Sequence, residues 1–163
     1  MSSTANATCR ARVSPPSSGL GARLRTSRGP SEVVDVGDEQ PLWAGASSKI
    51  LLRGASEAFL RRVAAASPQG EAQGEAQVER LRAWVTEAAE RGYAVSSSEF
   101  DEGLTAVAVP VTGRTGKVVA SLSLSGPSHR FPYEAVERFA TELAEGARLI
   151  SDQGFSHPLS SDA

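Results

Sequence analysis

The sequence of 163 residues has little cysteine and little histidine, and this excludes several kinds of site. Cys9 is the only cysteine, and His129 and His157 are the only histidines. No disulfide can form within the chain, and no Cys/His set exists to hold zinc. We therefore expect no metal site and no cofactor, in a reducing, cytoplasmic setting.

Long apolar runs are also missing. A helix that spans a bilayer needs roughly 20 consecutive apolar residues, and no stretch of the chain approaches that length. The N-terminal region has arginines and prolines where a signal peptide would need an apolar core. We expect a protein that is neither secreted nor attached to a membrane.

Acidic residues are absent from residues 1–30, which contain five arginines. Residues 31–163 carry 12 basic and 19 acidic side chains, a net charge of −7, although the whole chain has a net charge of only −2. A surface that docks on phosphates needs the opposite sign. The acidic part of the chain is therefore not expected to bind nucleic acid.

Residues 1–30 also have few large apolar side chains and no helical or strand period. Such a composition cannot offset the entropy lost on ordering, and a solvated tail is favoured over an arm that binds nucleic acid. We predict a disordered basic tail over 1–30, one domain over 31–155, and a second disordered tail over 156–163. A chain of this length supports one core.

Helical periodicity is found in three parts of the predicted domain. Residues 47–66 suit two short helices, with Gly54 ending the first and Ser56 capping the second. Apolar residues recur at helical spacing over 78–89, and Gly92 stops that helix. The third helix follows Pro132, with an apolar stripe of Val136, Phe139, Ala140, Leu143, Ala147 and Ile150.

Strand patterns lie between these helices. They predict short strands over 32–36 and 93–95, and a hairpin formed by 104–109, which ends at Pro110, and 117–125. The tetrapeptide Gly-Glu-Ala-Gln, present twice in succession from Gly70, is interpreted as a lengthened loop. This order of elements predicts an α+β fold with helices packed on an antiparallel sheet.

The strand 117–125 alternates cleanly, which predicts that its two faces have different environments. Val118, Ala120, Leu122 and Leu124 share one face, and Val119, Ser121, Ser123 and Ser125 share the other. Three hydroxyls in a row are too polar for a dry core. The serine face is therefore expected to meet water or a ligand.

Three motifs approach catalytic signatures without matching them. Residues 113–117 resemble a phosphate loop but lack its first glycine, continue into Val118, and join two strands, which indicates a hairpin turn. Residues 47–49 place a serine beside a lysine, but the Ser-x-x-Lys spacing would need a serine at position 46. His129 has no recognisable catalytic partner. We do not expect an enzyme.

Three segments resemble the effector-binding domain of IclR-family bacterial transcriptional regulators. Residues 37–52 resemble its Gly-Asp/Glu-x-x-Pro-Leu strand end followed by Ala-x-Gly-Lys-x-Leu-Leu; residues 91–111 resemble its Arg-Gly-Tyr-Ala, Glu-x-Gly and Ala-x-Pro-Val stretch; and residues 116–127 resemble its Gly-x-Val-x-Ala-x-Leu-Ser-x-Ser-Gly-Pro signature. The three occur in the family's order with sensible spacing. The resemblance covers about residues 32–153.

The resemblance implies a GAF-like sensory domain that binds a small metabolite, often a carboxylate. In such proteins an N-terminal winged helix-turn-helix reads the operator, and full-length members act as dimers or tetramers. The positions that would line the pocket are Ala46, Ser48, Ser96, Ala106, Ser123 and Ser125. Backbone N–H groups at a helix start and serine hydroxyls can together bind a carboxylate.

The sequence also departs from the family pattern. Trp43, Ser48, Ser96 and Ala106 differ from the residues usual there, so the resemblance does not name the effector. Nothing in residues 1–30 has the pattern of the winged domain, the linker helix or the first strands. We therefore expect a GAF-like sheet truncated at its N-terminal strands, with an open edge that favours self-association or pairing with a full-length relative.

The chain alone is accordingly expected not to bind DNA specifically. One alternative is a non-sensing interaction or remnant domain without a working pocket, and a less favoured one is an enzyme that uses Ser48 and Lys49.

Overall fold

The structure is a computed structural model that describes residues 12–13, 18–19, 39–68, 70–99 and 102–153. The described elements, in chain order, are β1 (Arg12–Val13), β2 (Ser18–Gly19), β3 (Glu39–Gln40), α1 (Ala46–Leu51), α2 (Glu57–Ala65), α3 (Gly70–Arg91), β4 (Ala94–Ser97), β5 (Leu104–Thr112), β6 (Val118–Pro127), the 3-10 helix Ser128–Arg130 and α4 (Tyr133–Asp152). They form the α+β architecture that the sequence predicts.

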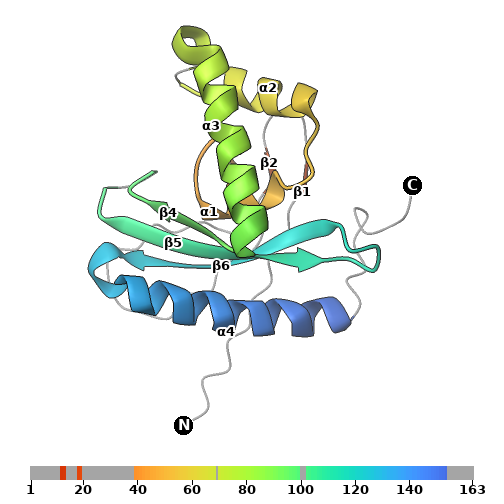
Figure 1. Ribbon diagram of the computed structural model, residues 1–163, viewed down its shortest axis with the longest axis vertical. Coiled ribbons are helices and arrows are strands. Elements are labelled where there is room, and N and C mark those ends of the chain that lie inside the picture. Colours follow the sequence, from red (N-terminus) through yellow and green to blue (C-terminus); the bar gives the residue numbers. More distant parts are fainter. Residues whose placement is uncertain (1–11, 14–17, 20–38, 69, 100–101, 154–163) are drawn as a thin grey trace.

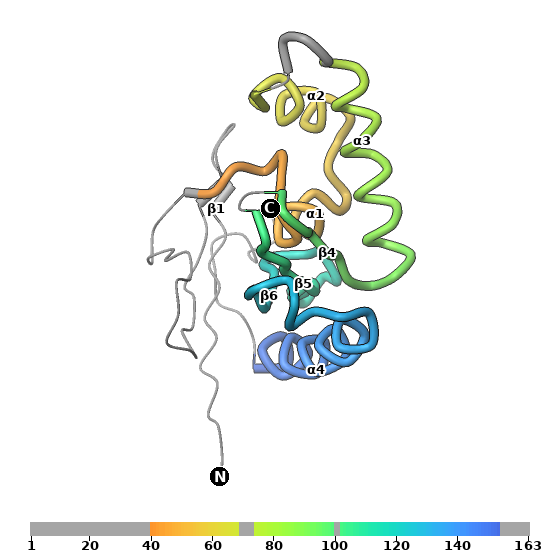
Figure 2. Tube along the Cα trace, turned by 90° about the vertical axis from the view of Figure 1, so that its left-hand side faces the viewer, coloured from red at the N-terminus to blue at the C-terminus, as the bar shows by residue number. Residues whose placement is uncertain are grey.

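An antiparallel sheet with the strand order β4-β5-β6 separates two helical layers. Helix α4 runs along one face, and α1 covers the other (Figures 1 and 2). Helices α2 and α3 extend from the α1 side as an arm that stands away from the sheet (Figure 1). Helix α1 contacts all three strands of this sheet.

The face toward α4 is the larger apolar core, as the stripe predicted for this helix requires. Val136, Ala140 and Ala147 of α4 are buried, and they pack against the sheet residues Val107, Val109, Val111, Ala120 and Leu122. Burial of a large aliphatic side chain contributes about 1.5–3 kcal/mol. This core therefore fixes α4 against one face of the sheet.

A β-bulge at the start of β6 changes which face of the sheet its first side chains occupy, compared with the predicted alternation. The register shifts between Val111 and Thr112, so that Thr112 pairs with Val118 while Val111 pairs with Ala120. Val119 joins the core on the α4 face, whereas Val118 packs with the α1 cluster. The prediction that Val118 shares a face with Ala120, and Val119 with the serines, is therefore wrong, because an extra residue in one strand inverts its alternation.

Strand β5 also continues beyond the predicted end at Pro110. It reaches Thr112, and Pro110 pairs with Ser121 of β6. The pairing with β4 stops at Ala108, so none of the described strands pairs with Pro110 on the side away from β6. A proline is tolerated at a strand edge, where no neighbouring strand requires its missing N–H group.

The repeated tetrapeptide is helical and not a loop. Helix α3 begins at Gly70 and includes both copies. A repeat of four residues adds about one helical turn of 3.6 residues, and alanine, glutamate and glutamine have high helix propensity. The predicted stop at Gly92 is confirmed by its φ of 76°, a conformation that glycine adopts readily.

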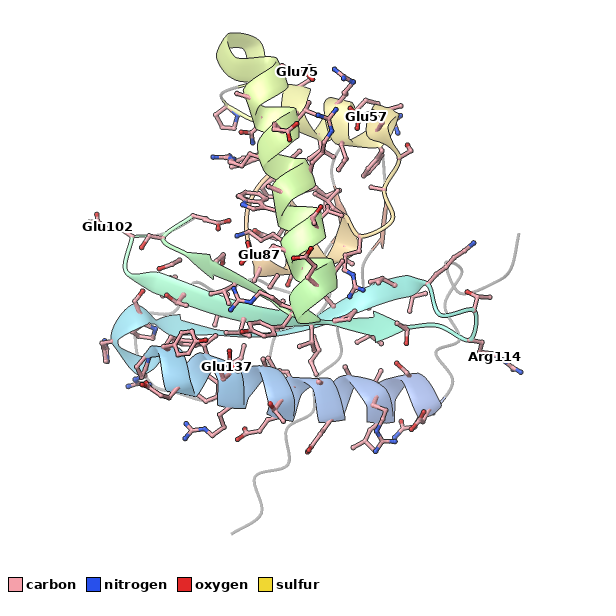
Figure 3. The ribbon with its side chains drawn as sticks, viewed as in Figure 1. Glu57, Glu75, Glu87, Glu102, Arg114 and Glu137 are labelled. Carbon is pink, nitrogen blue, oxygen red and sulfur yellow. The ribbon has the colours of Figure 1, made fainter. Side chains whose placement is uncertain are left out.

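The arm formed by α2 and α3 has its own apolar contacts and a charged rim. Leu60, Val63 and Leu81 are buried between the helices, and the side chain of Ser56 caps α2, as predicted, by accepting from the Phe59 N–H at 3.3 Å. Arg82 of α3 bonds Glu57 at the start of α2 and lowers the pKa of that carboxyl; Figure 3 labels Glu57 on α2. Exposed pairs of this kind stabilise a fold only slightly.

Part of the N-terminal stretch departs from the prediction that residues 1–30 lack regular structure. Strands β1 and β2 lie within it, and β2 pairs with β3 in a second small antiparallel sheet. Strands of two residues are too short to show an alternation in the sequence. The strand expected over 32–36 and the tail expected over 156–163 lie outside the described residues, and the domain limits remain predictions.

Candidate functional site

The sheet register brings three of the predicted pocket residues into one cross-strand row. Ala106 in β5 pairs with Ser96 in β4 and with Ser125 in β6. Directly paired residues project to the same face of a sheet. Ser96 is buried at 8% exposure, whereas Ser125 is exposed, so the row is closed at the β4 side and open at the β6 side.

The neighbouring row carries a fourth predicted residue and meets helix α1. Ser123 pairs with Ala108, which packs with Ala46 and Ile50 of α1. Ser123 is exposed, and Ala46 is buried at 2% exposure. The structure thus assembles Ala46, Ser96, Ala106, Ser123 and Ser125 on the α1 face of the sheet, where small side chains and hydroxyls predominate.

Ser48, the sixth predicted residue, has a different environment. It is buried, and its hydroxyl donates a hydrogen bond of 2.9 Å to the carbonyl oxygen of Pro41. This bond ties α1 to the segment that leads into it. A hydroxyl that donates to the backbone has no second proton to donate, so Ser48 holds the helix start in place.

A charged contact that sequence reasoning missed fastens the start of α1 to the loop after β4. The Lys49 ammonium lies 2.6 Å from Oε1 of Glu99 and 2.7 Å from the carbonyl oxygen of Val95. It also lies 4.3 Å from the ring centroid of Trp84. The two side chains are 10% and 22% exposed, so the pair is largely removed from water.

Glu99 binds the helix start through its second oxygen as well. Its Oε2 accepts a hydrogen bond of 2.9 Å from the Gly45 N–H. Gly45 has a φ of 91°, which L side chains rarely adopt. One carboxylate therefore holds both a backbone donor and a side-chain ammonium of the same short helix, and this fixes α1 above the sheet.

The same contacts involve both Ser48 and Lys49, the pair that the less favoured enzyme alternative would use. Lys49 is engaged by Glu99, and Ser48 donates to Pro41. The hydroxyl of Ser48 and the ammonium of Lys49 are thus each held by a partner other than the other member of the pair. Among the residues that the structure describes, no group of three or more His, Cys, Asp or Glu side chains could hold a metal ion.

None of the helices in the described part of the chain is long and apolar enough to cross a membrane.

One signal in the sequence could have pointed to a missed residue. Lys49 directly precedes an apolar run, residues 50–52, on a helix expected to be buried, where a charged side chain needs a partner. Glu99 lies 50 positions away, and only the fold brings the two together. Ser121 was placed on the serine face by alternation, but its complete burial depends on the packing above it.

Comparison with known proteins links these features to one family. Residues 22–152 match the family of bacterial transcriptional regulator IclR C-terminal domains. The HTH-type transcriptional regulator KdgR of Escherichia coli strain K12 is 44% identical over 64 residues, which are 39% of this chain and 24% of KdgR. The HTH-type transcriptional regulator XynR of the same strain is 33% identical over 73 residues, which are 45% of this chain and 29% of XynR. The matches thus span less than a third of each relative.

Solved structures show the same fold. An IclR-family transcriptional regulator from Rhodococcus sp. has a TM-score of 0.78 at 31% identity, and the match covers 89% of this chain and 55% of that one. The C-terminal domain of Escherichia coli KdgR has a TM-score of 0.65 at 26% identity, and the match covers 88% of this chain and 84% of that one.

Proposed function

Because this chain belongs to the family of bacterial transcriptional regulator IclR C-terminal domains, we propose that it senses a small organic acid on the α1 face of its sheet. The observation that carries the proposal is the pair of exposed hydroxyls of Ser123 and Ser125 beside the small residues Ala106 and Ala108. Hydroxyl donors that water reaches can exchange their water for a carboxylate. Through a longer protein, this binding would regulate transcription.

The other residues have distinct parts in the proposed site. Ala46 and Ala106 present only methyl groups and lie in one cluster between α1 and the sheet. Ser96 adds a hydroxyl at the buried end of the row. Ser48 acts indirectly, because its bond to Pro41 holds the helix start over the sheet.

We expect replacement of both Ser123 and Ser125 by alanine to weaken binding of the acid by roughly 100-fold or more. A hydrogen bond to a charged group contributes about 1.5–3 kcal/mol, and each 1.4 kcal/mol is a factor of ten. A thermal-shift screen of small carboxylic acids on the wild-type chain would first identify a binder, because a ligand in excess raises stability. Calorimetric titration would then compare the two proteins.

Thermal unfolding without ligand is the control for this variant. Both serines are exposed, and surface substitutions usually change stability by less than about 0.5 kcal/mol. If the double variant unfolds or binds the acid as the wild type does, the two hydroxyls are not the site. If no acid in the screen raises the stability of the wild type, the non-sensing alternative is favoured instead.

The chain alone is expected to show no preference for an operator sequence. Specific readers bind their site about 10³–10⁷ times more tightly than other DNA, and they do so with a helix or strand held rigidly in a groove. The described helices α1 and α4 pack on the sheet, and residues 31–163 have a net charge of −7. Anisotropy titration with the promoter next to its own gene and with a scrambled duplex should give equal, weak, salt-sensitive binding. A strong preference for the promoter would contradict this prediction.

A further inference from the structure

Ser121 in β6 has a buried hydroxyl without a partner. Its side chain has an exposure of 0%, and its Oγ makes no hydrogen bond in the structure. The large majority of buried side-chain polar atoms in proteins have a hydrogen-bond partner, because burial removes their hydrogen bonds to water and an unpaired group gains nothing in return. An unpaired hydroxyl at this depth therefore points to a partner that binds there.

The hydroxyl belongs to the face that carries the proposed site. Ala120 and Leu122, its neighbours in the strand, pack in the core on the α4 side, and alternation directs Ser121 to the opposite face. Ser123 lies two positions further on the same face. On this face of β6 the hydroxyl of Ser123 is therefore exposed, and the hydroxyl of Ser121, two residues earlier, is buried.

Small side chains lie beside the exposed end of this face, where Ala108 pairs with Ser123 and Ala106 with Ser125, whereas Ser121 pairs with Pro110. Ala106 and Ala108 of β5 lie on the α1 face together with Ala94 of β4. A stripe of small residues alone would indicate only close packing. The unpaired hydroxyl of Ser121 is the independent observation that points to a ligand, and the exposed Ser123 marks the end of the face that solvent reaches.

We propose that Ser121 binds a second, neutral oxygen of the effector, so that the ligand is an unbranched hydroxy or oxo acid. This rests on the proposed function, which places the carboxylate at Ser123 and Ser125. Successive residues of a strand advance about 3.4 Å, so the hydroxyls of Ser121 and Ser123 are roughly 7 Å apart. A chain of four or five carbons spans that distance. A second carboxylate is disfavoured, because burial penalises a charge far more than a hydroxyl.

The test uses three acids that differ only at the far end: 5-hydroxypentanoate, pentanoate and glutarate. Calorimetric titration of the wild-type chain should show that 5-hydroxypentanoate binds about three- to tenfold more tightly than pentanoate, the range of one neutral hydrogen bond. Glutarate should bind most weakly. In Ser121→Ala the preference for the hydroxyl acid should disappear, and pentanoate should bind as it does to the wild type.

Ser97→Ala is the matched control, because Ser97 lies in β4 next to Ser96 and so on the opposite face, where it bonds Thr105. It should keep the wild-type preference. Ser121→Ala should also unfold at the same temperature as the wild type or higher, since it removes an unpaired buried hydroxyl, whereas a purely structural hydroxyl would leave the variant less stable.

Equal binding of 5-hydroxypentanoate and pentanoate to the wild type would overturn the proposal. A preference for 5-hydroxypentanoate over pentanoate that persists in Ser121→Ala would also overturn the proposal. If the double variant Ser123→Ala with Ser125→Ala still binds all three acids more weakly, the proposed function stands without this further proposal. Failure of all three acids to bind at millimolar concentration would overturn the ligand class. The library screen decides separately whether the domain senses another acid.

Discussion

Replacing Lys49 with methionine is expected to lower the free energy of unfolding by about 3 kcal/mol. Methionine keeps most of the apolar stem but leaves Glu99 without its ammonium partner. Removal of one member of a buried ion pair costs about 3–5 kcal/mol, because the other charge stays buried and unpaired. Glu99 is 22% exposed and still accepts from Gly45, which places the expected loss at the low end of that range.

Urea unfolding followed by circular dichroism measures this loss. Lys117→Met is the matched control, because Lys117 is exposed in the turn before β6 and its replacement should change stability by less than about 0.5 kcal/mol. Glu99→Gln should cost less than Lys49→Met, since the amide oxygen can still accept from one of the two donors and Lys49 keeps its bond to the carbonyl oxygen of Val95. A Lys49→Met variant as stable as the control would show that the contact contributes nothing.

The sequence predicted the helices and strands in which the spacing of apolar residues repeats over many positions. Helix α4 repeats its apolar residues over 20 positions, and β5 and β6 alternate on both sides of a glycine turn. Such periods reflect burial on one face, which tertiary structure rarely overrides. The α+β fold and the helix stop at Gly92 therefore followed from local pattern alone.

Local pattern could not reveal features that depend on contacts between distant residues. The bulge that separates Val118 from Ala120 has no signature in the strand itself. A repeat of Gly-Glu-Ala-Gln suits a loop or a helix, and here it forms the first turns of α3, whose apolar contacts in the arm include Val78 and Leu81. The contact of Lys49 with Glu99 joins positions 50 residues apart, so charge and burial indicate only that each needs a partner.

In the proposed site, too, some features were predictable from the sequence and others depend on contacts between distant residues. The serine alternation of β6 was visible in the sequence, whereas the exposure of Ser123 and the burial of Ser121 are set by what packs above them. Resemblance to the family supplied Ala46 and Ser48, which no periodicity marks as binding residues. The structure separates these two, because Ala46 faces the sheet and Ser48 bonds Pro41.

Helix α1 has only six residues, and a helix of this length is not stable in isolation. Its position over the sheet must therefore come from packing, and Ile50 supplies the largest part. Ile50 is 0% exposed and lies in one cluster with Ala46, Ala88, Ala94 and Ala108. Four alanines offer no flexible side chain that could move into a vacated space.

We therefore expect Ile50→Ala to lower the free energy of unfolding by about 4 kcal/mol, in the upper part of the 2–5 kcal/mol range for such truncations, because the cavity cannot collapse. Ile50→Val should cost only about 0.5–1.5 kcal/mol. Leu149→Ala on α4, where the side chain is 55% exposed, is the control and should change little. Urea unfolding of the three variants decides the matter: a loss below about 1 kcal/mol for Ile50→Ala would mean that α1 is held by Lys49 and Glu99 alone. Since Ala46 lies on the same helix, the alanine variant that remains folded should also bind the acid more weakly than the valine variant.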